Sequence, residues 1–121
     1  MRILVTGSTT WTDRDSIRVA LQRFPAGTIL VTGDTAGADA LAIEIANELG
    51  FTVVAMRKND DDHAKYPEAA WMGLNERMMA VGIDRVIAFN KELGQTGRAR
   101  GTRHAIDLAL ARGIAVETVT S

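Results

Sequence analysis

Short runs of apolar residues alternate along the chain with longer stretches in which apolar residues recur every three or four positions. The short runs are rich in β-branched residues and predict five strands, at residues 3–6, 28–32, 51–56, 85–89 and 114–119. The first, second and fourth runs are apolar at nearly every position, which is typical of parallel strands buried on both faces. We therefore expect a five-stranded, mainly parallel sheet.

The stretches between these runs have the spacing of helices that bury one face. The first helix has Asp13 or Asp15 as a candidate N-cap and ends before Pro25. The other helices are expected over residues 38–49, 68–81 and 102–112, each followed directly by a glycine. This alternation predicts one α/β domain over residues 1–121, a Rossmann-like doubly wound sandwich of three layers.

Residues 57–67 form a polar segment that is too rich in charge to belong to the core. The segment is long for a connection between a strand and a helix, and loops of this length often line or cover binding sites. Its acidic run, Asp60, Asp61 and Asp62, lacks the spacing of a calcium-binding loop. We expect a solvated loop here, and no metal site or resident cofactor.

Composition narrows the possible functions. Cysteine is absent, which excludes disulfides, zinc–thiolate sites and cysteine nucleophiles. The 14 basic and 15 acidic side chains nearly cancel, so nucleic acid, which requires a basic surface, is not an expected partner. No apolar run approaches the roughly 20 residues that span a bilayer, and the first apolar run is too short for a signal peptide. We expect a cytoplasmic protein without a membrane partner.

Ligands of open α/β sheets bind beyond the carboxyl ends of the strands, where the strand order reverses. The first predicted strand is followed by Gly7, Ser8 and Thr9, whose backbone can approach a ligand closely and whose hydroxyls can donate to phosphate oxygens. The chain contains neither a GxGxxG fingerprint nor a P-loop. The interpretations as a hydride-transfer dehydrogenase or a P-loop NTPase therefore lose their main support.

A second group of candidates, Gly33, Asp34, Gly37 and Asp39, follows the second predicted strand and opens a helix. Amides at a helix N-terminus carry partial positive charge and suit a phosphate or a carboxylate. The two aspartates could cap that helix or bind ribose hydroxyls, and the residues alone leave both roles open.

The segment with the most suggestive chemistry follows the fourth predicted strand, where Gly101, Thr102, Arg103 and His104 open the last helix after a glycine-rich loop. Arginine matches phosphate geometry with two parallel hydrogen bonds, and the glycine and threonine would present free amides at the same point. We expect this group to contact an anionic ligand.

Large apolar side chains outside the strands need a separate explanation. Trp11 lies in the loop after the first strand, where its ring could stack on a base or pack on the first helix. The third predicted helix carries more of these residues than one core face requires, so we expect a homo-oligomer. They are Trp71, Met72, Leu74, Met78 and Met79.

Several of these residue groups occur in the order found in a known family. The groups are Gly7-Ser8, Trp11-Thr12-Asp13, Gly33-Asp34, Gly37-Ala38-Asp39, Asn75 with Met78, and Gly101-Thr102-Arg103-His104. Together they resemble the YspA-like branch of the SLOG superfamily, Rossmann-like proteins related to DprA and to the LOG phosphoribohydrolases. The resemblance spans nearly the whole chain and implies a nucleotide-binding domain, in a group that many phages encode. Asn75 would add a polar contact to the ligand.

Three positions depart from the family pattern. Thr9 and Leu74 stand where relatives carry arginines, so two ligand-facing arginines are replaced. Arg98 and Arg100 could compensate for them, or the ligand could differ. Ala105 stands where LOG enzymes carry a glutamate that takes part in glycosidic cleavage. Without that carboxylate, LOG-type hydrolysis lacks its acid/base group.

The leading hypothesis is therefore binding or sensing of a nucleotide or nucleotide-derived ligand at the carboxyl ends of the strands. The alternative is hydrolysis of an N-glycosidic or phosphate bond, which requires a catalytic acid or base. The candidates for that group are Asp34, Asp39, Glu76 and His104. A third interpretation, a DprA-like DNA-associated module, is disfavoured by the nearly neutral charge.

Overall fold

A single central sheet of five strands organises the protein, and the computed structural model describes all 121 residues. The strands lie in the order β3-β2-β1-β4-β5, and every neighbouring pair is parallel. Their bounds are β1 (Arg2–Gly7), β2 (Ile29–Thr32), β3 (Thr52–Ala55), β4 (Arg85–Phe89) and β5 (Ala115–Val119). The predicted Rossmann-like α/β architecture is confirmed, and the sheet is parallel throughout.

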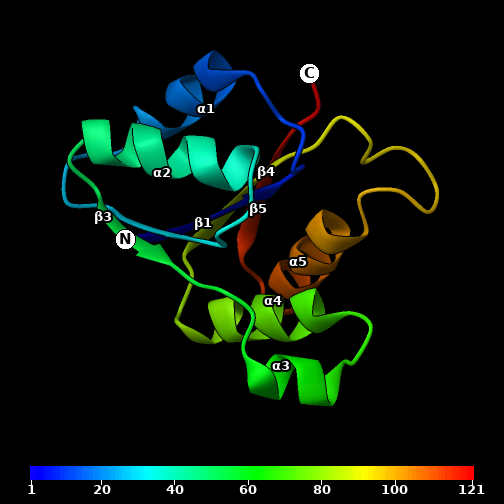
Figure 1. The fold of residues 1–121 in the computed structure, drawn as a ribbon. Helices are drawn as coiled ribbons and strands as arrows, with labels where there is room; N and C mark the ends of the chain where they lie inside the picture. Colours follow the sequence, from blue (N-terminus) through cyan, green and yellow to red (C-terminus); the bar gives the residue numbers. More distant parts are fainter.

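Helices cover both faces of this sheet. They are α1 (Arg14–Leu21), α2 (Ala38–Glu48), α3 (Asp60–Lys65), α4 (Ala70–Ala80) and α5 (Arg100–Ala111). Figure 1 shows α1 and α2 on one face, α4 and α5 on the other, and α3 on the outer side of α4. The three layers are those that right-handed crossovers between parallel strands produce. None of the helices combines the length and the apolarity needed to cross a bilayer.

Each face of the sheet has its own apolar core, because successive side chains of a strand point to opposite faces. Ile3 and Val5 of β1 belong to the core beneath α1 and α2, whereas Leu4 belongs to the core beneath α4 and α5. All three side chains are fully buried. This double burial explains why β1 reads as a continuous apolar run in the sequence.

Trp11 belongs to the core beneath α1 and α2, and only 3% of it is exposed. Its ring meets Phe89 edge to face, with the ring centroids 5.6 Å apart. The indole N–H donates to the carbonyl of Asp13 and to the hydroxyl of Ser16, and Asp13 is the N-cap of α1. Stacking of Trp11 on a base is therefore wrong as an expectation, because the loop after β1 turns the ring inward to pack beside α1.

The polar segment that follows β3 contains a helix, although its sequence predicts a solvated loop. The helix α3 starts with a capping box, in which the Asn59 side chain accepts from the Asp62 amide and the Asp62 carboxylate accepts from the Asn59 amide. Asp62 is only 3% exposed and forms an ion pair with Arg77 of α4. Asp60 and Asp61 are exposed, as expected, but the loop interpretation is wrong because all three aspartates lie in α3.

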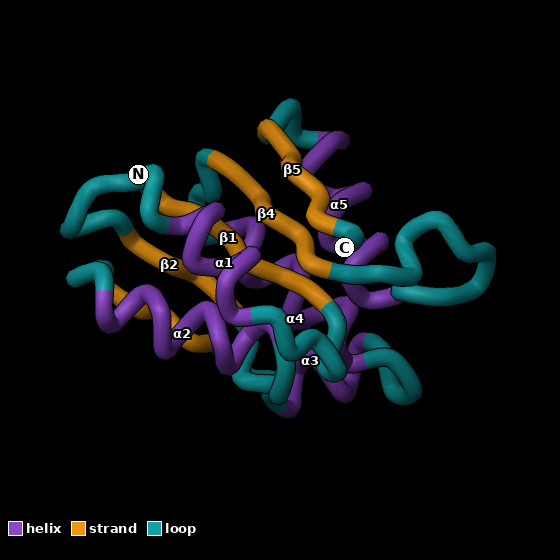
Figure 2. The backbone as a smooth tube through the Cα atoms, turned by 90° about the horizontal axis from the view of Figure 1, so that it is seen from above, coloured by secondary structure: helices purple, strands orange, loops and turns teal.

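The order of the strands in the sheet produces a crevice at the carboxyl ends of two central strands. The crossovers from β1 to β2 and from β3 to β4 run in opposite directions, which places the reversal of strand order between β1 and β4. Seen from above, β2, β1, β4 and β5 run side by side, and residues 90–99 leave the end of β4 as a loop that projects from the body (Figure 2). The carboxyl ends of β1 and β4 are therefore the expected place for a ligand.

Candidate functional site

A cleft of about 460 Å³ lies at the carboxyl ends of β1, β2 and β4. Its walls come from the loop after β1, the N-terminal ends of α2 and α5, one side of α4, and the segments that follow β3 and β4. Most of the side chains that line it are polar. Its volume falls within the range of roughly 300–1,000 Å³ that is typical of small-molecule sites.

The loop after β1 forms the floor of the cleft, and its path depends on a glycine. A Cβ on Gly7 would lie 2.3 Å from the carbonyl oxygen of Phe89 and 2.7 Å from the Cβ of Ala38, so no larger residue fits. The Ser8 amide donates to the carbonyl of Phe89 at 2.8 Å, and the Ser8 hydroxyl is hydrogen bonded to that of Thr10 at 2.8 Å. Gly7 therefore brings the backbone close to β4 and α2, and Ser8 presents its hydroxyl at the cleft.

The next residue of this loop, Thr9, also lines the cleft, and its backbone N–H has no partner within the protein. Gly37 packs against the same loop from the start of α2. Its φ angle is +78°, and a Cβ there would lie 2.3 Å from the carbonyl oxygen of Ser8. Gly37 thus allows α2 to begin beside the loop, and it does not itself line the cleft.

Asp39 brings a buried carboxylate to the cleft from the first turn of α2. It is 8% exposed, and the Thr35 hydroxyl donates to it at 2.9 Å. Burial raises the pKa of the Asp39 carboxyl above its ordinary value, and the hydrogen bond from Thr35 partly opposes that change. A Cβ on Gly33 would lie 2.7 Å from a carboxylate oxygen of Asp39, so Gly33 leaves room for this group.

The expectation that an aspartate could cap α2 is wrong. The N-cap of α2 is Gly37, and no side chain accepts from the first amides of the helix. Asp39 lies inside the first turn, where its charge still interacts favourably with the helix dipole. The carboxylate of Asp39 is therefore directed to the cleft region rather than to a cap.

The helix α5 begins with free amides at the cleft. Its N-cap, Ala99, has a left-handed backbone with a φ angle of 55°, and no side chain caps the helix. The amides of Arg100, Gly101 and Thr102 make no hydrogen bond within the protein. All four residues line the cleft, so these donors are available to an anion there.

Two buried asparagines hold the start of α5 in place. Asn90 donates to the hydroxyl of Thr102 at 3.2 Å. Asn75 of α4 donates to the carbonyl of Gly101 and to Nδ1 of His104, both at 3.1 Å. Because the amide nitrogen is the donor, Nδ1 of His104 accepts and its ring proton lies on Nε2. Burial lowers the pKa of His104, which favours this neutral form near pH 7.

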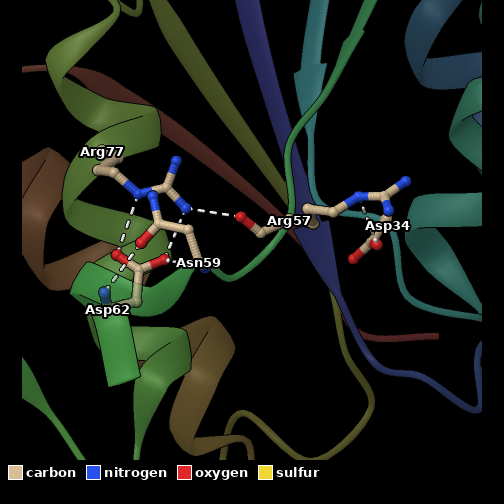
Figure 3. Close-up of polar contacts among 5 residues, drawn as sticks. All are labelled: Asp34, Arg57, Asn59, Asp62 and Arg77. Atoms are coloured by element: carbon tan, nitrogen blue, oxygen red, sulfur yellow. Dashed lines mark hydrogen bonds and ion pairs between the residues drawn. The ribbon is translucent and has the colours of Figure 1, made fainter. Parts of the chain in front are cut away.

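Three of the residues expected to contact the ligand point elsewhere. The Arg103 guanidinium donates to the carbonyl of Leu93 on the exposed loop after β4. Asp34 pairs with Arg57 across 3.7 Å (Figure 3), and neither residue lines the cleft. His104 lies behind the cleft wall, where it supports Asn75 rather than lining the cavity.

The cleft carries both signs of charge. Lys58 and Arg100 contribute the positive groups, and Asp39 and Glu92 contribute the negative groups. The Arg100 guanidinium lies 5.8 Å from the centroid of the Trp71 ring, which forms part of the wall. Arg100, rather than Arg103, therefore brings a guanidinium to the free amides of α5.

Two comparisons with known proteins bear on this fold and cleft. A family model described as the YspA, cpYpsA-related SLOG family matches residues 1–63, just over half of the chain. The chain is also 34% identical to the Gene 61 protein of Mycobacterium phage D29 over 122 residues, which cover 95% of this chain and 93% of that protein. The chain belongs to the YspA, cpYpsA-related SLOG family. The resemblance found in the sequence motifs is thus confirmed, and the phage relative fits the expected phage context.

The structure of this SLOG protein brings most of the residues proposed from the sequence to one cavity. Those that line the cleft are Gly7, Ser8, Thr9, Gly33, Asp39, Asn75, Gly101 and Thr102. Those that do not line it are Asp34, Gly37, Arg103 and His104. At the position where LOG enzymes carry a glutamate, Ala105 is fully buried in the core beneath α4 and α5.

Sequence reasoning missed several residues of the SLOG cleft. Asn90 directly follows a strand, which was a usable signal. The sequence indicates Arg100 only as a substitute for the two family arginines that are replaced here. The sequence predicts Trp71 as a core or subunit contact, yet it is half-buried at the cleft wall. Lys58 lies in the polar segment after β3, and nothing in the local pattern distinguishes it from its charged neighbours.

The apolar residues of α4 are largely explained within one chain of this SLOG protein. Leu74, Met78 and Met79 belong to the core beneath α4 and α5, and Trp71 lines the cleft. The excess of apolar residues that suggested a homo-oligomer therefore has another cause, and self-association stays a prediction.

Proposed function

We propose that this SLOG protein binds or senses a nucleotide or a nucleotide-derived ligand in the cleft. One observation carries the proposal: three free amides of α5, the free amide of Thr9 and the hydroxyl of Ser8 converge on one cavity at the switch point of the sheet. Backbone amides at a helix N-terminus are suited to phosphate oxygens. Arg100 lies at the same helix start and would neutralise phosphate charge.

The remaining walls suit the other parts of a nucleotide. The Asp39 carboxylate and the Thr35 hydroxyl lie on the α2 side and would bind ribose hydroxyls. Leu74 and Met78 add an apolar surface from α4 on which a base would pack. Asn75 uses its amide nitrogen within the protein, which leaves its carbonyl oxygen as an acceptor for the ligand.

Binding is favoured over LOG-type turnover because Ala105 lies in the core and supplies no carboxylate. A second function, hydrolysis of a nucleotide bond, is supported by one observation alone. Asp39 lines the cleft, and burial raises the pKa of its carboxyl, as general acids and bases in enzymes require. Of the four acid/base candidates proposed from the sequence, Asp39 is the one that lines the cleft.

The proposal is tested by native mass spectrometry of the protein purified without added ligand, followed by thermal unfolding with a panel of nucleotides. A ligand at ~100 times its dissociation constant adds about 2.7 kcal/mol to the free energy of unfolding. We expect at least one nucleotide to stabilise the protein and Arg100→Gln to reduce that effect. Arg112→Gln is the matched control, because Arg112 is exposed at the opposite end of the same helix.

The two functions separate when the stabilising nucleotide is incubated with the protein and then analysed by mass. Intact ligand supports binding or sensing. A cleaved product that disappears with Asp39→Asn, while the ligand still binds, supports hydrolysis. A panel in which no nucleotide shifts the unfolding transition would refute the proposal.

A further inference from the structure

Lys58 lines the cleft although it belongs to no helix or strand of the sandwich. It follows the edge strand β3 within the short segment that connects β3 to α3. Its side chain lines the cleft, and its ammonium forms no ion pair or hydrogen bond with another residue. A long, flexible side chain on a connecting segment would contribute little to a binding site unless its backbone were held.

The backbone on both sides of Lys58 is held by one ion pair, formed by Asp62 of α3 and Arg77 of α4. Arg77 donates to the carbonyl of Arg57 at 2.6 Å, so the peptide group before Lys58 is fixed. The amide of Asn59 donates to the Asp62 carboxylate at 3.0 Å, so the peptide group after Lys58 is fixed as well. Figure 3 shows both contacts reaching the segment from the same pair.

The pair itself has the geometry of a strong contact. Arg77 donates from Nε to one carboxylate oxygen of Asp62 at 3.0 Å and from Nη2 to the other at 2.6 Å. This forked arrangement restricts both side chains more than a single contact would. Arg77 holds the pKa of the Asp62 carboxyl below its ordinary value, so the pair stays charged over the physiological range.

The neighbouring helix leaves no freedom for this carboxylate. A Cβ on Gly73 of α4 would lie 2.6 Å from a carboxylate oxygen of Asp62, so α3 and α4 meet at this point. α3 packs on the outer side of α4 and covers neither face of the sheet. The pair is buried only at its acidic end, because the Asp62 side chain is 4% exposed and that of Arg77 is 33% exposed.

We infer that the Asp62–Arg77 pair is a positioning device that fixes Lys58 at the cleft, where its ammonium meets an anionic group of the ligand. The inference rests on the proposed function, since it concerns the same cleft. It adds a second source of positive charge on the β3 side of the cleft, in addition to Arg100 at α5. Asp62 and Arg77 act through Lys58 and do not themselves line the cleft.

The same segment is tied to the loop after β2. The Arg57 side chain pairs with Asp34 at 3.7 Å, and Thr35, the next residue, lines the cleft. The Asp62–Arg77 pair is thus linked through Arg57 to two residues that line the cleft, Lys58 after β3 and Thr35 after β2. Lys58 is the more direct of the two, because both of its flanking peptide groups are bound.

The test is a double-mutant cycle that measures binding of inorganic pyrophosphate. Binding is detected by the NMR chemical shifts of the backbone amides. Pyrophosphate carries the anionic group without the base or the ribose, and NMR detects weak binding. The variants are Lys58→Gln, Asp62→Asn and the combination of both. Glu117→Gln is the matched control, because it also removes a carboxylate from arginine partners but lies on β5, outside the cleft.

We expect Lys58→Gln to weaken pyrophosphate binding about three- to tenfold and Asp62→Asn to do the same. The double variant should bind no more weakly than Lys58→Gln alone, because the effect of Asp62 passes through Lys58. A purely structural role of Asp62 would instead multiply the two effects. Glu117→Gln should bind pyrophosphate as the unaltered protein does. If Asp62→Asn does not fold, Arg77→Lys replaces it, since lysine keeps the charge but not the forked contact.

Three results would overturn the inference: unchanged binding by Lys58→Gln, multiplied effects in the double variant, or no pyrophosphate binding by the unaltered protein. The proposed function is judged separately by the nucleotide panel. A nucleotide that binds the unaltered protein and Lys58→Gln equally well removes the inference and leaves the proposed function standing.

Discussion

Replacing Asp39 with asparagine should change stability and ligand binding in opposite directions. The carboxylate is 8% exposed in the first turn of α2, and burial raises its pKa above the ordinary value of 3.8. Asparagine has nearly the same shape, and its carbonyl oxygen can still accept from the Thr35 hydroxyl. The substitution removes the charge and replaces one of the two accepting oxygens, to which the Thr35 backbone also donates, with an NH2 group.

The sign of the stability change follows from the raised pKa. The carboxyl binds its proton more tightly in the folded protein than in the unfolded chain, so the charged form opposes folding at any pH above the folded-state pKa. Relief of this burial cost is worth about 1–3 kcal/mol. Loss of the favourable interaction with the dipole of α2 offsets about 0.3–1 kcal/mol. We expect Asp39→Asn to stabilise the protein by up to about 2.7 kcal/mol at pH 7.

The assay is chemical denaturation at pH 7 and again as the pH approaches 4, where the carboxyl becomes protonated in the folded protein. The gain should shrink at the lower pH. Asp84→Asn is the control, because the exposed Asp84 lies before β4, at the opposite end of the sheet, and accepts from the Arg2 amide. The nucleotide found by the panel should bind Asp39→Asn at least about tenfold more weakly, a loss of about 1.4 kcal/mol. A variant that is less stable than the unaltered protein at pH 7 would refute the reasoning on burial.

The other predictions concern residues around the cleft. Gly7→Ala should destabilise the protein by about 3 kcal/mol or more, because its Cβ would meet the Phe89 carbonyl at 2.3 Å; denaturant midpoints measure this loss. Gly33→Ala should leave the fold intact and weaken nucleotide binding, since its Cβ would displace the Asp39 carboxylate at 2.7 Å; calorimetric titration tests it, and a collapse of the fold would contradict it. The folded-state pKa of His104 is lowered, so its contribution to stability should fall as the pH drops below the ordinary value of 6.5. His104→Gln should remove that part of the pH dependence, and unfolding curves of both proteins at pH 7.5 and 5.5 compare them.

The fold was accessible from the sequence because parallel strands buried on both faces leave a direct trace in the pattern. Ile3, Leu4 and Val5 face two different cores, so no polar residue interrupts the run. The helix α3 was not accessible in the same way, because it buries little apolar surface. Its start depends on the reciprocal bonds of Asn59 and Asp62, a capping signal that the surrounding charges obscured.

The candidate site was predicted to the level of segments but not of individual side chains. α5 begins at Arg100, two residues before the predicted start, and each residue along a helix turns by roughly 100°. Arg100, Gly101 and Thr102 line the cleft, whereas the Arg103 side chain turns to the loop after β4. Lys58 could not be found from sequence, because its position depends on contacts between elements that are distant along the chain.

The most direct test of the central claim is an NMR titration of the isotope-labelled protein with the nucleotide that most raises its unfolding temperature. The account predicts that the largest shifts fall on the amides of Thr9, Arg100, Gly101 and Thr102, which have no partner within the protein. Shifts confined to another surface, or none at ligand concentrations well above the apparent dissociation constant, would contradict the assignment of this cleft as the binding site.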